Sequence, residues 1–422
     1  MKIKKQFLLV LSVVAGVFCS CSPQEKSEDI YVFDVEEAVE NIEEIPLSKY
    51  ASSIEYIPLG VGDSVYLSRT QGMTLSDEYI FVLANLHKTI HLFSKEGKFI
   101  RNIGHKGRAE GEFLGVRKMT YFPESRVLEV ATKGKFLTFS VEDGKYLRSF
   151  DFNDLADQFL ERYIDDQEDR KRTEFDESLL EGLNIGDGNY LFIAVMPYVP
   201  NPIYAEYVED KSYEVYALVD TLHQITTLEK KKLTFIRRNG SRGRFPEFSR
   251  MYKLNGETNI ILAKQDTLLV LKNKKLEPKM VIRSGKYSNN DNNWNEADFV
   301  FLADRDMGYV ESLEGLFVTA QMPTYKCIYA SDKREVNIVY DKAERKTRIV
   351  KFDELSGSAG LKNDLDSGMP FWPTGYANGI MFTTVEADLF IELSEKYNSP
   401  KMKEVAAKLT PDSNPVVVVV KK

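Results

Sequence analysis

The sequence contains few of the residues that usually form covalent cross-links or catalytic centres. Its 422 residues include three cysteines, four histidines and two tryptophans. The short motifs of serine hydrolases, P-loop NTPases, zinc proteases and dithiol oxidoreductases are absent from it. These absences exclude the motif-defined enzyme classes. Carboxylate pairs for glycoside cleavage stay open, because fold geometry and not spacing along the chain places such pairs.

Cysteine and histidine usage predicts neither a disulfide nor a metal site. Cys19 lies in a predicted leader, and acylation of Cys21 would leave Cys327 alone in the mature chain. Cys327 lies in the strand-like run YKCIYA, which is typical of a small buried hydrophobe. His87 and His91 are four residues apart but fall around a predicted strand, so a zinc site is not expected.

No apolar run is long enough to span a bilayer. The run Phe7–Val17 has about eleven residues and follows the basic residues Lys2, Lys4 and Lys5. This arrangement is typical of a signal peptide, and we assign residues 1–20 to it.

The leader ends in a pattern that resembles a bacterial lipobox. Small Ser20 precedes Cys21, although Phe18 stands where leucine or valine is usual. We therefore expect lipidation of Cys21, with plain secretion as the alternative. Several acyl chains on one residue would anchor the protein stably. This predicts an outer membrane lipoprotein, on the periplasmic or the cell-surface side, that contacts the membrane through its anchor only.

Charge argues against nucleic acid as a partner. The net charge is −8, and loss of the three leader lysines makes it −11. A surface of this sign does not attract a polyphosphate chain. The polar, acidic residues 21–46 are expected to form a tether between the lipid anchor and the folded domain.

A hairpin-like segment occurs twice with an offset of 47 residues. FSKEGKFIRNI at 93–103 matches FSVEDGKYLRSF at 139–150, so that Gly97 corresponds to Gly144 and Arg101 to Arg148. Aromatic and β-branched runs flank a glycine turn in both copies. A period of about 40 to 50 residues with several turn-separated strands is typical of propeller blades.

The segment after the first copy carries a family resemblance. The run IGHKGRAEGEF at 103–113 resembles the loop motif of NHL-type six-bladed propellers. The wider pattern resembles the six-bladed β-propeller lipoproteins of Bacteroidetes, through SIEYIPLG at 53–60, NDLDSGMPFWP at 363–373 and SNPVVVVVKK at 413–422. The resemblance implies an all-β, six-bladed propeller over residues 47–422. Members of that family are mostly of unknown function.

Two features of the blades can be placed in advance. Residues 153–183 are charged, with Leu155 and Phe159 at helical spacing, and predict a helical insertion in the third blade. The five valines Val416–Val420 would aggregate as an open edge, so we expect them to pair with residues 53–59 and close the ring. The first blade is expected to contain residues 54–57 together with strands between 79 and 103.

Two tracts could form a ligand site. Asp364 and Asp366 alternate along an extended chain and could hold calcium, while Phe371 and Trp372 offer flat faces suited to sugar rings or peptides. The alternative is a blade-joining turn in which the aspartates bond backbone amides and the aromatics seal the core.

The second tract is the loop at 104–113. It carries His105, Arg108 and Glu110, which could act as ligands or as acid and base. Simple decoration of the propeller rim is the alternative.

These observations predict a non-enzymatic binding or scaffold lipoprotein without a cofactor, whose partner is a glycan, a peptide or an envelope protein. The alternative is an NHL-like lyase or hydrolase acting at the mouth of the central channel. Convergent carboxylates and histidines at that mouth would favour the enzyme, whereas an aromatic shelf or an apolar rim patch would favour binding.

Overall fold

The computed structural model describes most of the chain from residue 30 onward. The described ranges are 30–63, 65–68, 70–84, 89–173, 175, 179–196, 198, 212–232, 250–261, 267–285, 300–301, 309–321 and 335–422. The predicted signal peptide, the lipidation residue Cys21, and Cys327 lie outside these ranges.

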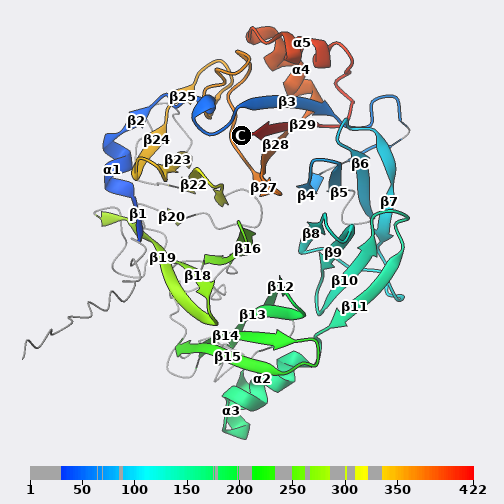
Figure 1. Cartoon of the computed structure of the whole chain (residues 1–422), viewed down its shortest axis with the longest axis vertical. Helices are drawn as coiled ribbons and strands as arrows, with labels where there is room; N and C mark the ends of the chain where they lie inside the picture. The colour runs from blue at the N-terminus through cyan, green and yellow to red at the C-terminus, as the bar shows by residue number, and fades with distance from the viewer. Residues whose placement is uncertain are drawn as a thin grey trace, which may run out of the picture.

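Six mainly antiparallel sheets form a ring, which is the predicted six-bladed propeller (Figure 1). In the first five blades the main strands run in chain order from the centre of the ring outward, whereas the sixth blade takes its outermost strand from the N-terminal part of the chain. The first blade contains β4 (Thr70–Leu75), β5 (Tyr79–Ala84), β6 (Thr89–Ser94) and β7 (Phe99–His105). The second contains β8 (Lys118–Phe122), β9 (Val127–Ala131), β10 (Lys135–Ser140) and β11 (Tyr146–Asp151). The third contains β12 (Leu180–Gly186), β13 (Asn189–Met196), β14 (Tyr213–Asp220) and β15 (Ile225–Lys232).

The other three blades complete the ring. The fourth contains β16 (Arg250–Leu254), β17 (Glu257–Ile261), β18 (Thr267–Lys272) and β19 (Lys275–Arg283). The fifth contains β20 (Val300–Phe301) and β21 (Tyr309–Glu311), which both pair with β22 (Gly315–Gln321), followed by β23 (Glu335–Asp341) and β24 (Lys346–Val350). The sixth contains β27 (Gly375–Ala377), β28 (Ile380–Val385), β29 (Val416–Lys421) and β3 (Ser53–Pro58).

The predicted ring closure is confirmed, and it explains the run of five valines. β29 pairs antiparallel with β3, with Val418 opposite Tyr56. Val417 and Val419 pack into the core shared with the first blade, whereas Val416, Val418 and Val420 pack into the core shared with the fifth. Because a blade buries both of its faces, every position of this strand must be apolar.

The predicted composition of the first blade was wrong. Residues 54–57 belong to the outermost strand of the sixth blade, and the innermost strand of the first blade is β4. The sequence TQGMTL of β4 contains a glycine and few β-branched apolar residues, so its strand propensity is weak. Pairing with β5 nevertheless holds it in the sheet.

The repeated hairpin is confirmed at the level of single residues. Gly97 and Gly144 occupy the turns between the two outer strands of the first and second blades, at φ +85° and +75°. Each turn packs on the outermost strand of the preceding blade. A Cβ on Gly97 would lie 2.2 Å from the carbonyl oxygen of Pro58, and one on Gly144 would lie 3.1 Å from that of Asn102.

Residues 31–43, which the sequence assigns to the tether, form part of the folded body. β1 (Tyr31–Asp34) pairs in parallel with β19, α1 (Val35–Glu40) follows, and β2 (Ile42–Glu43) pairs in parallel with β24. Phe33, Val35 and Ala38 are fully buried. Residues 31–43 therefore form a strap across the outer edges of the fourth and fifth blades. It is missed at the level of sequence because the segment is acidic overall and has only these three fully buried apolar residues.

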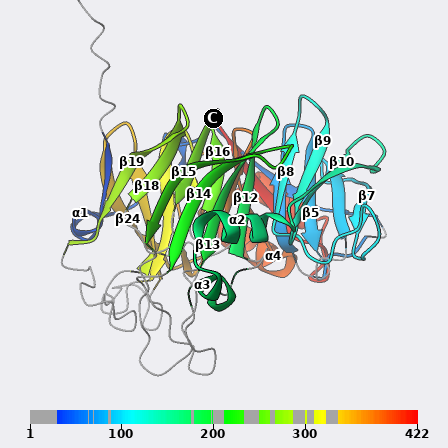
Figure 2. The ribbon, with the colours of Figure 1, turned by 90° about the horizontal axis from the view of Figure 1, so that it is seen from below.

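The longer helices lie outside the sheets. α2 (Leu155–Tyr163) and α3 (Gln167–Arg172) connect β11 to β12, so the helical segment precedes the first strand of the third blade and does not interrupt that blade. α4 (Ala387–Lys396) and α5 (Pro400–Ala406) lie between β28 and β29. In a side view of the ring, α3 and α4 lie toward the same face (Figure 2).

The remaining short elements are η1 (Leu47–Lys49), β25 (Phe352–Asp353) and β26 (Ser358–Ala359). Within the described residues, no helix has the length and apolarity needed to cross a membrane.

Candidate functional site

Asp364 and Asp366 do not face a common site. Asp364 accepts hydrogen bonds from the backbone N–H and the hydroxyl of Ser48, at 2.9 and 2.5 Å. Although partial burial opposes the effect, these bonds hold the pKa of Asp364 below its ordinary value. Asp366 accepts from the hydroxyls of Tyr56 (3.1 Å) and Ser399 (2.6 Å). The two carboxylates therefore tie different segments together and do not converge as calcium ligands.

Asp366 also accepts bonds from the side-chain amide of Asn363 at 2.6 Å and the backbone N–H of Gly368 at 3.1 Å. These add to its two hydroxyl partners, so its oxygens are largely satisfied by protein donors. Among the described residues, no group of three or more His, Cys, Asp or Glu side chains is placed to hold a metal ion.

The two aromatic residues of the same tract seal a core. Phe371 is 1% exposed and packs in the cluster between the fifth and sixth blades, so it cannot present a face to a ligand. The indole N–H of Trp372 donates to the hydroxyl of Thr319 at 3.0 Å, and its ring meets Phe317 edge-on at 5.7 Å. This tract is thus a blade-joining turn.

The loop after β7 forms its own local contacts. The imidazole of His105 pairs with the carboxylate of Glu112 at 2.7 Å, and Glu112 also accepts the backbone N–H of Ala109 at 2.8 Å. The bond from Ala109 is the main cause that lowers the pKa of Glu112. Arg108 and Glu110 are exposed on the same loop. Nothing in this arrangement brings His105, Arg108 and Glu110 together around a ligand.

Several carboxylates that sequence analysis missed are paired with tyrosine hydroxyls. Tyr50 donates to Asp341 at 3.0 Å, across 291 residues of chain, and Tyr397 donates to Asp353. Burial raises the pKa of Tyr50, so the hydroxyl remains a donor. Together with the bond from Tyr56 to Asp366, these pairs link the segment after η1 to β23, the end of α4 to β25, and β3 to the tract at 363–373.

A deeply buried carboxylate lies between the fourth and fifth blades. The side chain of Glu311 is 1% exposed, and its Oε1 lies 2.7 Å from the ammonium of Lys342 and 3.3 Å from that of Lys279. The hydroxyl of Tyr252 donates to it and contacts that of Tyr309 at 2.7 Å. Burial lowers the pKa of Lys342. Because this cluster is enclosed by protein, we interpret it as an internal fastening of the two blades.

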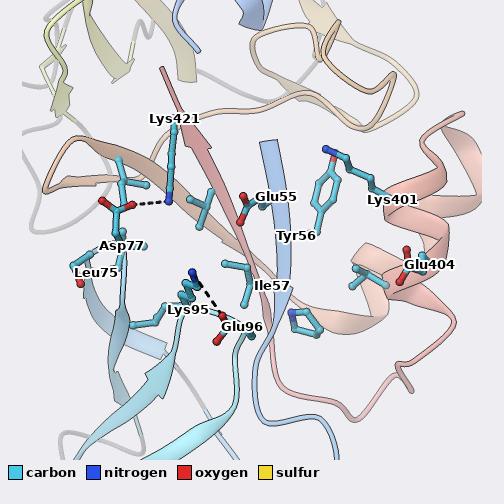
Figure 3. A pocket seen from close by; sticks show the side chains of 16 residues that line it. Glu55, Tyr56, Ile57, Leu75, Asp77, Lys95, Glu96, Lys401, Glu404 and Lys421 are labelled. Atoms are coloured by element: carbon cyan, nitrogen blue, oxygen red, sulfur yellow. Dashed lines mark hydrogen bonds and ion pairs between the residues drawn. The ribbon is translucent and has the colours of Figure 1, made fainter. Parts of the chain in front are cut away.

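A cleft of about 560 Å³ lies where the ring closes (Figure 3). Its volume is in the range of small-molecule and peptide sites. It follows four consecutive residues of β3, with α5 on one side and two turns of the first blade on the other. The cleft is lined by Glu55, Tyr56, Ile57, Pro58, Leu75, Ser76, Asp77, Ile80, Lys95, Glu96, Ile380, Lys401, Glu404, Val405, Val419 and Lys421.

The cleft combines aliphatic side chains with a rim of mixed charge. Pro58 and Val405 are partly exposed and supply accessible apolar surface. The other aliphatic lining residues belong to the core between the sixth and first blades and are at most 8% exposed: Ile57, Leu75, Ile80, Ile380 and Val419. The rim carries four carboxylates and three ammonium groups. No single stretch of sequence could have revealed it, because its lining comes from segments as far apart as residues 55 and 421.

The rim charges are held loosely. Lys421, which is partly exposed, pairs with the exposed Asp77 at 2.7 Å, and the exposed Lys95 approaches Glu96 at 3.9 Å. Exposed pairs of this kind contribute at most about 1 kcal/mol. Lys401 donates to the backbone carbonyl of Ile54 at 3.2 Å. A ligand could therefore exchange these partners at low cost.

Comparisons with known proteins identify relatives by fold. Residues 30–421 match a family model described as Domain of unknown function (DUF4934). A comparison with curated proteins finds no match. A solved Bacteroides fragilis protein, provisionally described as exported, has a TM-score of 0.57 and 14% identity, covering 93% of this chain and 100% of that chain. A DUF4221 family member from Bacteroides vulgatus has a TM-score of 0.45 and 11% identity, covering 88% and 97%.

Proposed function

The chain belongs to the family described as Domain of unknown function (DUF4934), and we propose that it is a non-enzymatic binding or scaffold lipoprotein that uses the cleft beside β3. The observation that supports this function is the cleft itself, with its aliphatic side chains and its rim of mixed charge. A site of this composition can bury apolar groups of a ligand and orient it with a few charged contacts. The candidate ligands are a glycan, a peptide and a partner protein of the envelope.

The proposed location is the outer membrane, with the propeller held by a lipid on Cys21. The leader, the short apolar run and Ser20 before Cys21 support this location, as does the likeness to a Bacteroides protein provisionally described as exported. The anchor is the only membrane contact we propose, and the net negative charge disfavours nucleic acid as a partner. Metabolic labelling with a palmitate analogue should mark the wild-type protein and not Cys21→Ala. Equal labelling of both proteins would contradict lipidation at this residue.

The binding function is tested by charge reversal on α5. Lys401 lines the cleft, whereas Lys403 is exposed on the same helix and is not part of the lining. Purified wild type, Lys401→Glu and Lys403→Glu are applied to a glycan array and to an array of synthetic octapeptides. We expect at least one probe whose affinity falls tenfold or more in Lys401→Glu and stays within twofold in Lys403→Glu. Binding that is equal in all three proteins, or absent on both arrays, would overturn the proposal.

A further inference from the structure

We infer that the cleft is a strand-addition site, in which an extended segment of a partner polypeptide pairs with the free edge of β3. The inference rests on the proposed function, because it names the ligand class of the same cleft. β3 is the outermost strand of the sixth blade and has β29 on one side only. The cleft follows its other side over Glu55–Pro58.

The chain itself shows that outer edges of this ring accept an added strand. In the fourth blade β1 pairs with the outermost strand β19, placing Phe33 opposite Ile282. In the fifth blade β2 pairs with the outermost strand β24, placing Ile42 opposite Ile349. β3 holds the equivalent place in the sixth blade. The cleft therefore lies where two other blades carry an extra strand.

The backbone of β3 offers hydrogen-bonding groups toward the cleft. The backbone N–H of Leu59 donates to the carbonyl of Pro415 at 3.3 Å. In the register of the two strands, the backbone groups of Ile57 and Glu55 therefore also face β29. The backbone groups of successive residues in a strand point alternately to its two sides, so those of Ile54, Tyr56 and Pro58 point away from β29. The contact of Lys401 with the carbonyl of Ile54 agrees with this direction.

The free edge is short, which limits what can bind. Pro58 has no N–H, and its carbonyl oxygen lies so close to Gly97 of the first blade that a Cβ there would be 2.2 Å away, so pairing cannot include this residue. Lys401 holds the carbonyl of Ile54 at the other end. The N–H and C=O of Tyr56 lie between them and form the centre of the proposed pairing. A brief extended stretch of a partner fits this edge, whereas a long β-strand does not.

The two walls of the cleft suit the alternating side chains of such a segment. α5 presents Lys401 and Glu404 on one side, and the first blade presents Lys95 and Glu96 on the other (Figure 3). Successive side chains of an extended chain point to opposite sides, so each wall of the cleft would contact every second side chain of the bound segment. Aliphatic residues flanked by residues of both charges match this lining.

The lining favours a polypeptide over a sugar. Sugar sites usually offer an open aromatic face. Of the described residues that line the cleft, Tyr56 is the one aromatic, and it is 7% exposed. Its hydroxyl is bonded to Asn363 and Asp366, and its ring lies 5.4 Å from that of Phe390. It is thus committed to the core.

Backbone methylation of the probe tests the inference. The probes are immobilised octapeptides that alternate aliphatic residues with lysine and glutamate. The tightest binder is remade with one N-methyl group at each position in turn. Strand addition predicts that methylation weakens binding tenfold or more at one position near the centre, whose N–H would bond the carbonyl of Tyr56, and less than twofold at the positions on either side of it.

Each outcome separates the inference from the proposed function. Sensitivity confined to one central position in the wild type, together with weakened binding in Lys401→Glu and not in Lys403→Glu, supports both. Binding that depends on Lys401 but is insensitive to methylation, or that is confined to the glycan array, overturns strand addition and leaves the binding function standing. Absence of binding on both arrays overturns both.

Discussion

At the scale of single residues, the glycines of the outer turns set how closely neighbouring blades pack. Gly97 adopts a left-handed conformation and lies against the backbone of β3. Gly144 repeats this arrangement one blade further along the ring. In the third blade the equivalent turn holds His223 at φ +60°, and its ring meets Phe150 of β11 edge-on at 5.1 Å. This turn position can thus hold a side chain in the third blade, because it faces the aromatic ring of Phe150 and not a closely packed backbone.

The contact of Gly97 can be measured with a matched pair of alanine variants. Gly62 has a similar conformation, φ +81°, but a Cβ there would meet nothing within 4 Å. We expect Gly62→Ala to lower the free energy of unfolding by about 1 kcal/mol, from backbone strain alone. Gly97→Ala should lower it by about 3 kcal/mol, because overpacking adds to the strain. Equal effects in urea unfolding would show that the close approach to Pro58 is not important.

Glu129 is a buried acid between the second and third blades. It is 6% exposed and accepts a hydrogen bond from the side-chain amide of Asn184 at 2.7 Å. Burial raises its pKa, although the bond from Asn184 and nearby basic groups oppose the shift. The folded protein therefore holds this proton more tightly than the unfolded chain does.

This shift makes part of the stability depend on pH. The contribution of Glu129 is fully present below about pH 4.3, the unfolded value, and is lost as pH rises through the raised pKa. We expect Glu129→Gln to be more stable than wild type at pH 8 and to approach it near pH 4. Urea unfolding over this range measures the difference, with the exposed Glu124→Gln as control. A Glu129→Gln variant that is less stable than wild type at pH 8 would contradict this account.

At the scale of elements, the N-terminal strap joins two blades from outside. Asp34 caps α1 by accepting the backbone N–H of Glu37 at 3.0 Å, and it also pairs with Arg283 of β19 at 3.2 Å. Glu43 of β2 pairs with Arg348 of β24 at 2.9 Å. Phe33 anchors this strap in the core shared by the fourth and fifth blades.

Truncation of that anchor should destabilise the protein substantially. Phe33 is 0% exposed, and replacing such a residue by alanine usually costs about 3–5 kcal/mol. Ile30→Ala is the control, since Ile30 is 46% exposed and lies just before β1. We expect Phe33→Ala to lower the urea midpoint and to expose residues 30–46 to protease, with little effect from Ile30→Ala. Similar midpoints for the two variants would mean that the strap is dispensable.

At the scale of the whole molecule, the ring is closed without covalent bonds by one pair of strands from opposite ends of the chain. β29 and β3 pair over six positions, from Val416 opposite Pro58 to Lys421 opposite Ser53. Asn414 adds bonds from its side-chain amide to the carbonyls of Leu59 and Val65, at 3.2 and 2.8 Å. Ring closure therefore brings together residues that are more than 300 positions apart in the sequence.

A hydroxyl in this seam should weaken closure. Val418 is 0% exposed, and Val418→Thr keeps the shape of the side chain while burying a polar group, which costs about 1–3 kcal/mol. Val61 is 45% exposed, so Val61→Thr should be neutral within about 0.5 kcal/mol. Thermal unfolding of both variants checks the difference. Equal melting temperatures would show that the seam does not limit the stability of the ring.

The sequence by itself determined the blade repeat, the turn glycines and the closing strand. These features are local, because a turn that needs φ > 0 and a strand buried on both faces each restrict residue choice at their own positions. Gly97, Gly144 and Val416–Val420 could therefore be identified without the fold. Similarly, the alternative interpretation of residues 363–373 as a blade-joining turn could be stated in advance.

Only the tertiary structure decided which segments meet. Asp364 and Asp366 alternate along the chain, yet their partners Ser48 and Tyr56 lie more than 300 residues away. The cleft beside β3 likewise exists because ring closure brings α5 and the turns of the first blade to the same strand. Contacts between residues so far apart leave no period or motif in the sequence. For this reason the candidate site, unlike the propeller, could not be predicted from it.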